Sequence, residues 1–398
     1  MSFARHFGFQ KGGLDDEYLL EAAIHKTGLS DFGEDSFRPG FEQLLRSLRD
    51  EARLSPLGVM IAQQEILMAL GNRLQLQDYH QRHPQMGAAA IEAPIFIIGQ
   101  GRSGTTIMHE LLSLDPTLRV PLTWEVDFPF PPPESDSYQT DPRIEQVQKT
   151  LNQADRVLPA FKRIHRMGAT LPQECVRFTT GEFASLIFWT NYNVPAYTEW
   201  LRTEADMVAV YRYHRRFLQL LQSHHQTGPW VLKSPAHLWS LDVLLDEYPD
   251  ARFIQTHRDP LKMLASLTSL VTHLRKMGSG EVDPLSIAVE WARWNAWGLN
   301  ASAEFRSSGR VPPERIVDID FHEFMNSPLE QLQKIYSHLG LSLEPEVRAS
   351  MQSYLDKHNA AEHGAHRYTF ADTGLDVATE RARVQQYQDY FHTPVEIQ

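Results

Sequence analysis

The stretch that decides the fold reads PIFIIGQGRSGTT and occupies residues 94–106. Its first half, residues 95–98, is a short continuous apolar run, which is typical of a strand buried on both faces of a parallel sheet. Its second half is a glycine-rich turn, after which Met108, Leu111 and Leu112 fall on one face of a helix. A strand, a glycine-rich turn and a helix in this order open a βαβ unit, so we expect an α/β protein.

The turn has the form of a phosphate-binding loop in all but one position, because Gly99 is followed after four residues by Gly104, Thr105 and Thr106. Such a loop points backbone N–H groups and the positive end of a helix at a phosphate. Nucleoside triphosphatases place Lys directly after the second glycine, whereas here Thr105 stands there and the cation is Arg102. The loop therefore predicts a shorter, bent anion with a 5′-phosphate on the helix terminus. The alternative is an ordinary strand-to-helix turn.

A second candidate anion site follows another predicted strand at 252–256. Arg258 comes directly after this strand, and Ser266 lies eight residues later on a predicted helix that starts near Pro260. An arginine fork and a hydroxyl can hold a second, separate phosphate. Taken alone, an arginine at a strand end also fits a structural ion pair.

The rest of the chain is organised around this α/β region. Further buried strands are predicted at 230–232 and 315–320. Residues 1–90 have helical periodicity and are expected to form an N-terminal extension, in which a helix begins at Ser55-Pro56 and ends near Gly71. Residues 91–398 are expected to form the α/β domain, with a helical insertion at about 130–225 that covers a site.

Composition narrows the function classes. The chain has 398 residues, of which 42% are hydrophobic, and its 38 basic and 50 acidic residues give a formal charge of −12. Such an acidic chain disfavours non-specific binding to nucleic acid or anionic membranes. The single Cys175 excludes an intrachain disulfide and a cysteine-based zinc site. No apolar run is long enough for a membrane span or a signal peptide, so we expect a cytoplasmic protein.

Together these features resemble the superfamily of sulfotransferases that use 3′-phosphoadenosine 5′-phosphosulfate (PAPS). The loop at 102–106 reads RSGTT and is similar to the family's 5′-phosphosulfate loop, whose common form is KSGTT. Arg258 and Ser266 match the family's 3′-phosphate pair in identity and spacing. The segment 317–341 follows the family pattern, and the stretch around Arg367 and Tyr368 is similar to a cofactor-covering loop. The resemblance covers about 94–392.

The resemblance implies a fold, a cofactor and a set of binding residues. The fold is an α/β core like that of P-loop nucleoside-triphosphate hydrolases, with a central parallel sheet flanked by helices. The co-substrate is PAPS, whose sulfonyl group moves in line to a hydroxyl or amine of the acceptor. The residues expected to bind it are Gly101, Arg102, Ser103, Gly104, Thr105, Thr106, Arg258, Ser266, Arg367 and Tyr368.

Two cations are expected to stabilise the charge that develops on the leaving phosphate oxygen. Arg102 stands where the family commonly has Lys, and it keeps the positive charge while adding a fork. Lys233 ends a predicted strand, at the position of a family lysine that approaches the sulfonate. Fixed cations aimed at developing charge do most of the work in such transfers. A solvated surface lysine is the alternative for Lys233.

Two residues are candidates for the general base that accepts the acceptor's proton. Glu125 follows the helix after the loop, where several family branches have a catalytic carboxylate, and Trp124 could supply the burial that a glutamate base needs. His237 lies four residues after Lys233, near the base histidine of the cytosolic branch. Histidine needs no pKa shift to act near neutrality. We prefer Glu125 and keep His237 as the alternative.

No metal is expected, because the donor has no β,γ-diphosphate to bridge; a cluster of His358, His363 and His366 is the less favoured possibility. The acidic balance and the aromatic insertion favour a small or lipid-like hydroxyl acceptor. The rival functions are a nucleoside kinase or triphosphatase on the same fold, which would depend on magnesium, and a nucleotide-binding protein without catalysis.

Overall fold

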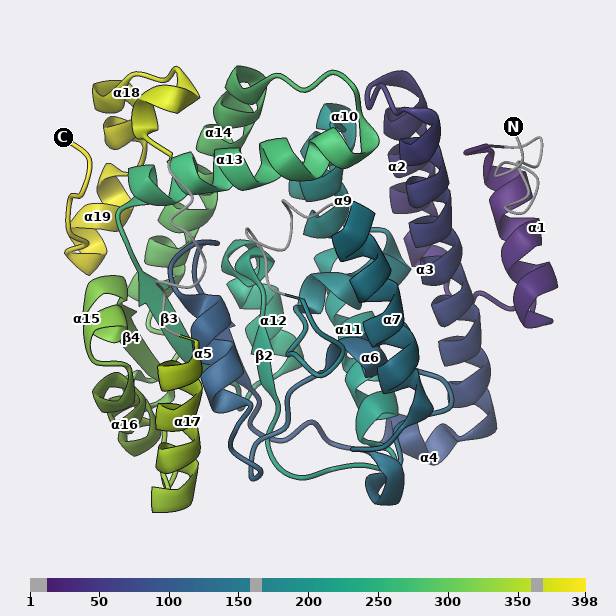
Figure 1. Ribbon diagram of the computed structural model, residues 1–398, viewed down its shortest axis with the longest axis horizontal. Coiled ribbons are helices and arrows are strands. Elements are labelled where there is room, and N and C mark those ends of the chain that lie inside the picture. Colours follow the sequence, from purple (N-terminus) through teal and green to yellow (C-terminus); the bar gives the residue numbers. More distant parts are fainter. Residues whose placement is uncertain (1–12, 158–166, 359–367) are drawn as a thin grey trace. The chain divides into compact units, whose positions relative to one another are not determined.

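The strands predicted from the apolar runs assemble into one parallel sheet. The computed structural model describes residues 13–157, 167–358 and 368–398. The sheet formed by the described strands has the order β2-β1-β3-β4, with every neighbouring pair parallel. Figure 1 labels β2, β3 and β4. The strand bounds are β1 Ile95–Ile98, β2 Val231–Lys233, β3 Arg252–His257 and β4 Ile316–Asp320. The predicted α/β class with a central parallel sheet is thereby confirmed.

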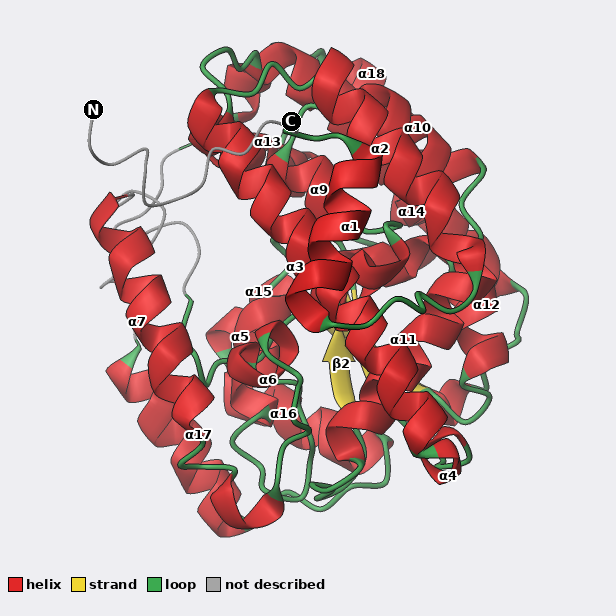
Figure 2. Cartoon of the chain, turned by 90° about the vertical axis from the view of Figure 1, so that its right-hand side faces the viewer, coloured by secondary structure: helices red, strands yellow, loops and turns green. Residues whose placement is uncertain are grey.

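The sheet belongs to a compact unit made of residues 89–178, 217–273 and 283–398. Ile95 and Ile97 of β1 pack with side chains of helices α5 (Thr105–Leu112), α16 (Pro328–His338) and α17 (Pro345–Lys357). On the other face, the Phe96 ring contacts Tyr248 at 5.4 Å and Phe253 at 6.0 Å between centroids. Because both faces are covered, β1 can be apolar throughout. Strands are drawn in yellow in Figure 2.

Further helices complete this unit or begin in it. They are α6 (Thr123–Asp127), α7 (Pro142–Val157), α12 (Leu241–Glu247), α13 (Pro260–Gly278), α14 (Pro284–Ser307), α15 (Phe321–Asn326), α18 (Val377–Arg383) and α19 (Gln385–Phe391). None of the helices within the described ranges is long and apolar enough to cross a membrane.

The edge strand β2 is covered by a segment of the same unit. The Arg119 backbone N–H donates to the carbonyl of Pro229 at 3.0 Å, and its carbonyl accepts from the N–H of Val231 at 2.7 Å. This short parallel bridge lies just before α6. It satisfies backbone groups that an edge strand would otherwise leave open.

A second compact unit consists of residues 1–88, 179–216 and 274–282. Its helices include α1 (Asp16–Thr27), α2 (Arg38–Asp50), α3 (Pro56–Arg82), α4 (Pro84–Gly87), α9 (Leu186–Asn191) and α10 (Pro195–Thr203), and α11 (Met207–Gln222) begins in it. The predicted division at residue 90 differs from these units, because 179–216 groups with the N-terminal helices instead of the insertion. The Phe183 ring shows why, since it packs edge-on against Phe41 at 5.0 Å between centroids.

The helix that begins at Pro56 is longer than predicted. Ser55 accepts a hydrogen bond from the Gly58 N–H, as expected of an N-cap. The helix then continues through Gly71 to Arg82, whereas the sequence predicted its end near Gly71. A side chain at Gly71 would meet only Thr27, at an ordinary 3.7 Å. Packing of α3 against α1 therefore outweighs the local tendency of glycine to end a helix.

Candidate active site

The glycine-rich loop between β1 and α5 has the conformation that its glycines permit. Gly99 has φ 151°, Arg102 has φ 79° and Gly104 has φ 85°. A Cβ on Gly99 would lie 2.1 Å from Thr256 Oγ1, so only glycine fits there. The Ser103 hydroxyl donates to the Gln100 carbonyl at 2.6 Å and lies 2.7 Å from the same Thr256 hydroxyl. The loop is thus closed by an internal hydrogen bond and is held to β3 through Thr256.

The structure brings Arg102, Arg258 and Ser266 together. Arg102 Nε donates to Ser266 Oγ at 3.0 Å, and Arg258 Nη1 donates to the Arg102 carbonyl at 3.1 Å. Burial lowers the pKa of Arg102, with Arg258 adding to this effect and Tyr368 opposing it. An arginine remains charged in spite of such a shift. Two guanidinium groups and a hydroxyl therefore form a concentrated site for an anion, and Arg102 is turned toward the predicted 3′-phosphate residues.

Lys233 ends β2 and faces the start of α5. Its side chain is 4% exposed, so it is not a solvated surface lysine. Its Nζ lies 3.5 Å from Thr106 Oγ1 and forms a short hydrogen bond with the carboxylate of Glu174. The parallel pairing of β1 with β2 explains the position, because Ile97 and Lys233 are register partners.

Glu174 is a site residue that the sequence did not reveal. It directly precedes the short 3₁₀ helix η4 (Cys175–Arg177) within the predicted insertion, and its side chain is 22% exposed. No motif surrounds it, and its importance follows only from its contact with Lys233. The insertion thus supplies a carboxylate to the site.

Glu125 lies in a different environment from the one expected of a base. It is completely buried, and both carboxylate oxygens bind Arg119, at 2.8 and 2.5 Å. The same carboxylate also accepts from the Tyr138 hydroxyl at 3.0 Å and from the Leu122 N–H at 2.8 Å. Burial, together with the Glu125 charge, raises the pKa of Tyr138, so this hydroxyl stays protonated and donates. This is the geometry of a structural ion pair, closed to an acceptor molecule.

His237 is also enclosed. It lies on the 3₁₀ helix η6 (Pro235–Trp239), with only 3% of its surface exposed. Its ring packs edge-on against Phe96 at 5.0 Å between centroids. The structure therefore places His237 in the core beside β1.

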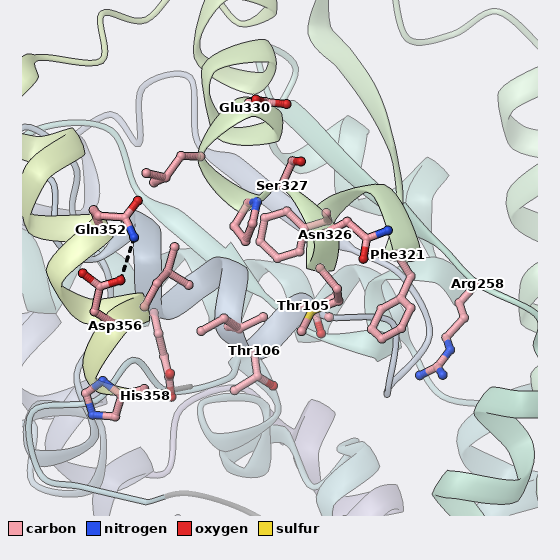
Figure 3. Close-up of a pocket in the computed structure, with 18 of the residues that line it drawn as sticks. Thr105, Thr106, Arg258, Phe321, Asn326, Ser327, Glu330, Gln352, Asp356 and His358 are labelled. Atoms are coloured by element: carbon pink, nitrogen blue, oxygen red, sulfur yellow. Dashed lines mark hydrogen bonds between the residues drawn. The ribbon is translucent and has the colours of Figure 1, made fainter. Parts of the chain in front are cut away.

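A cavity of about 820 Å³ begins at the loop and runs along α5 to α17. Figure 3 shows Arg258 and Phe321 toward one end and Asp356 and His358 toward the other, with Thr105 and Thr106 between them. The Arg258 guanidinium lies over the Phe321 ring, 3.8 Å from its centroid.

The remaining predicted residues are only partly covered by the structure. Tyr368 is described, and Lys262 Nζ lies 5.2 Å from its ring centroid. Arg367, His363 and His366 lie outside the described residues, so the cofactor-covering loop and the histidine grouping stay predictions.

The parallel sheet and the glycine-rich loop after β1, with the arginines beside it, define an α/β protein with a P-loop-like fold. Residues 94–345 match the model of the sulfotransferase family, and the chain belongs to this family. The predicted family and the predicted sulfonyl transfer are thereby confirmed.

Solved structures support this assignment. The chain is 30% identical to sulfotransferase STF1 of Mycobacterium tuberculosis H37Rv, with a TM-score of 0.83 over 94% of this chain and 99% of that one. It is also 30% identical to sulfotransferase STF9 of Mycobacterium avium, with a TM-score of 0.85 over 96% and 98% of the two chains.

A curated relative is more distant. The omega-hydroxy-beta-dihydromenaquinone-9 sulfotransferase Stf3 of Mycobacterium bovis is 24% identical over 282 residues, which span 67% of this chain and 68% of the relative.

Proposed function

We propose that this sulfotransferase takes its sulfonyl group from PAPS and transfers it, without a metal ion, to a hydroxyl of a small or lipid-like acceptor. The proposal rests on the contact between the glycine-rich loop and a second cationic site, which contains Arg258 and Ser266. Arg102 lies in the loop, and its Nε bonds Ser266 Oγ at 3.0 Å. A ligand with two separate anionic groups fits such a pair of sites.

Each part of the site then has a role toward this donor. The loop N–H groups and the start of α5 bind the 5′-phosphosulfate end. Arg258 and Ser266 bind the 3′-phosphate, for which a guanidinium fork is well suited. We add Arg102 to this group, in place of its expected role at the leaving phosphate oxygen, because its Nε bonds Ser266. The donor, when bound, supplies an activated sulfonyl group, and the chain supplies binding, orientation and charge.

Lys233 and Glu174 are the residues we assign to the transfer itself. Lys233 stabilises the negative charge on the leaving phosphate oxygen, from a position beside Thr106. Glu174 replaces Glu125 as our proposed base, because its carboxylate contacts Lys233 and keeps 22% exposure. It accepts the proton of the acceptor hydroxyl as the sulfonyl group arrives.

The acceptor class rests on composition and on one relative. Stf3 of Mycobacterium bovis carries the name of a hydroxylated dihydromenaquinone, which is a lipid-like alcohol. We propose an acceptor of this chemical class here. The single cysteine and the charge of −12 support a cytoplasmic protein that binds no nucleic acid.

The donor assignment is tested by calorimetry with two nucleotides. Adenosine 3′,5′-bisphosphate should bind more tightly than adenosine 5′-phosphate, because a charge-assisted contact contributes roughly 1.5–3 kcal/mol, or about ten- to a hundredfold. Arg258→Ala should remove most of the difference. Arg258 Nε donates to the carboxylate of Glu396 at 2.9 Å, so Glu396→Gln is measured beside the wild type. If both proteins bind the two nucleotides equally, the assignment is wrong.

A further inference from the structure

A carboxylate of the chain itself already lies on the arginine assigned to the 3′-phosphate. Arg258 Nε donates to Glu396 Oε1 at 2.9 Å, and Arg258 Nη2 donates to Glu396 Oε2 at 3.3 Å. Both side chains are largely buried, with 12% exposure for Arg258 and 17% for Glu396. This two-pronged contact is the one that a guanidinium fork makes with either a carboxylate or a phosphate.

His322 makes a second contact with the same carboxylate, since its Nε2 lies 3.1 Å from Glu396 Oε1. Burial disfavours ionisation of Glu396, but the hydrogen bonds from Arg258 and His322 outweigh it and lower the pKa of Glu396. The carboxylate is therefore charged at neutral pH. An anionic group is thus held on Arg258, which is one of the residues that we assign to the 3′-phosphate.

The backbone around Glu396 is held by other residues. The N–H groups of Glu396 and Ile397 donate to Asp259 Oδ2 at 2.6 and 2.9 Å. Arg381 bonds both Asp259, at 2.6 Å, and the carbonyl of Ile397, at 2.6 Å. These contacts do not involve the Glu396 side chain. The anchoring of the backbone at residues 396 and 397 therefore does not depend on the contact between the Glu396 side chain and Arg258.

We propose that Glu396 is an internal competitor for the 3′-phosphate. Binding of a 3′-phosphorylated nucleotide exchanges the carboxylate for the phosphate on Arg258, and release of the nucleotide returns the carboxylate. Arg258 is thus paired in both states, which avoids an uncompensated charge in a largely buried place. The competition weakens the nucleotide's apparent affinity by the fraction of molecules in which Arg258 is free. This inference rests on the proposed function.

The test compares nucleotide affinities of the wild type and Glu396→Gln. The glutamine has the same shape as Glu396 but carries no charge. The affinity for adenosine 3′,5′-bisphosphate should therefore rise by about tenfold, which corresponds to wild-type molecules in which Arg258 is free about one tenth of the time. The affinity for adenosine 5′-phosphate should not change, because this nucleotide has no 3′-phosphate that would bind Arg258. Asp389→Asn is the matched control, since it removes one exposed negative charge from nearby α19.

A double variant shows whether the gain acts through Arg258. In an Arg258→Ala background, Glu396→Gln should have no effect on bisphosphate affinity, because the two residues share one interaction. An unchanged or lower bisphosphate affinity in Glu396→Gln, with wild-type discrimination intact, overturns the competitor role alone. Equal binding of both nucleotides by wild type and Glu396→Gln overturns the proposed donor as well. Glu396→Ala provides the same comparison if the glutamine variant does not fold.

Discussion

The carboxylates of Glu125 and Glu174 each bond a basic side chain, but their surroundings differ. Glu125 is completely buried and bonded to Arg119 through both oxygens, whereas Glu174 is partly exposed and contacts Lys233. A fully enclosed ion pair strongly resists the loss of one partner, since the other charge is left buried. A partly exposed carboxylate beside a functional lysine can exchange a proton with a bound molecule. Burial therefore separates a structural role from a chemical one.

We predict that Glu174→Gln lowers turnover by roughly 10²–10⁴, the usual cost of losing a general base. Its melting temperature should fall less than that of Glu125→Gln, because Glu174 is 22% exposed, although the 4% exposed Lys233 loses its charged partner. Sulfonyl transfer from labelled PAPS measures the rate, and calorimetry checks that bisphosphate still binds. Full turnover in Glu174→Gln would remove Glu174 from the mechanism.

We predict that Glu125→Gln instead destabilises the fold, by about 3–5 kcal/mol, since it leaves Arg119 charged and buried. Thermal unfolding measures this change. Any loss of activity should follow the loss of folded protein. A variant with wild-type stability and a much lower rate would return Glu125 to the role of base, and the same result for His237→Gln would favour the histidine.

At the scale of elements, the loop depends on one close approach between β1 and β3. Gly99 stands where a Cβ would lie 2.1 Å from Thr256 Oγ1, and its φ is 151°. We predict that Gly99→Ala shifts the loop, lowers the melting temperature and abolishes measurable nucleotide binding. Gly280→Ala is the control, because a Cβ there has nothing within 4 Å. Wild-type nucleotide binding by Gly99→Ala would show that the loop tolerates the displacement.

The elements that the sequence predicts well are those whose signal is local. The apolar run at 95–98 is β1 at Ile95–Ile98, because a strand buried on both faces can be apolar throughout. The end expected near Gly71 was wrong, because contact with α1 is not visible in the sequence of α3. Local pattern thus predicts strands better than helix ends that depend on packing.

The same distinction applies to the site. Arg258 and Ser266 were predicted as a pair eight positions apart in the sequence, and the structure brings both to Arg102. Glu174 and Glu396 have no motif, because each meets its partner across 59 and 138 residues of sequence. Contacts between residues so far apart in the sequence cannot be predicted from a local motif. They form only in the folded chain, after the sheet has positioned the strand ends.

At the scale of the whole molecule, buried histidines predict how stability depends on pH. Burial lowers the pKa of His80 to about 4 and those of His109 and His214 to about 3. After burial, the second cause is a nearby positive charge. Arg216 further lowers the pKa of His80, and Lys233 further lowers the pKa of His109. All three are therefore neutral in the folded chain at pH 5–6, where an unfolded histidine, with a pKa of about 6.5, becomes charged.

The unfolded chain consequently binds more protons than the folded chain between about pH 6.5 and 4, and stability falls as the pH falls through this range. We predict a lower melting temperature at pH 5.5 than at pH 7.5. His109→Gln should reduce the difference, whereas substitution of the exposed His25 should not. A melting temperature independent of pH over this range would contradict the role of the buried histidines.

A further whole-molecule prediction concerns metal. Because the proposed donor has no diphosphate for magnesium to bridge, sulfonyl transfer should persist in excess chelator. The measurement is turnover with labelled PAPS before and after chelation. Loss of activity that magnesium restores would favour a nucleoside kinase or triphosphatase.

The backbone bridge between Arg119 and β2 has a consequence for aggregation of the protein. The backbone of Arg119 contacts Pro229 and Val231 and so occupies the outer edge of the sheet, and the Arg119 side chain is held by Glu125. When that ion pair is lost, the segment can leave and expose an apolar strand edge to other molecules. Open edges of this kind pair between chains and seed aggregates. Variants at Arg119 or Glu125 should therefore be lost from solution with a rate that rises with protein concentration.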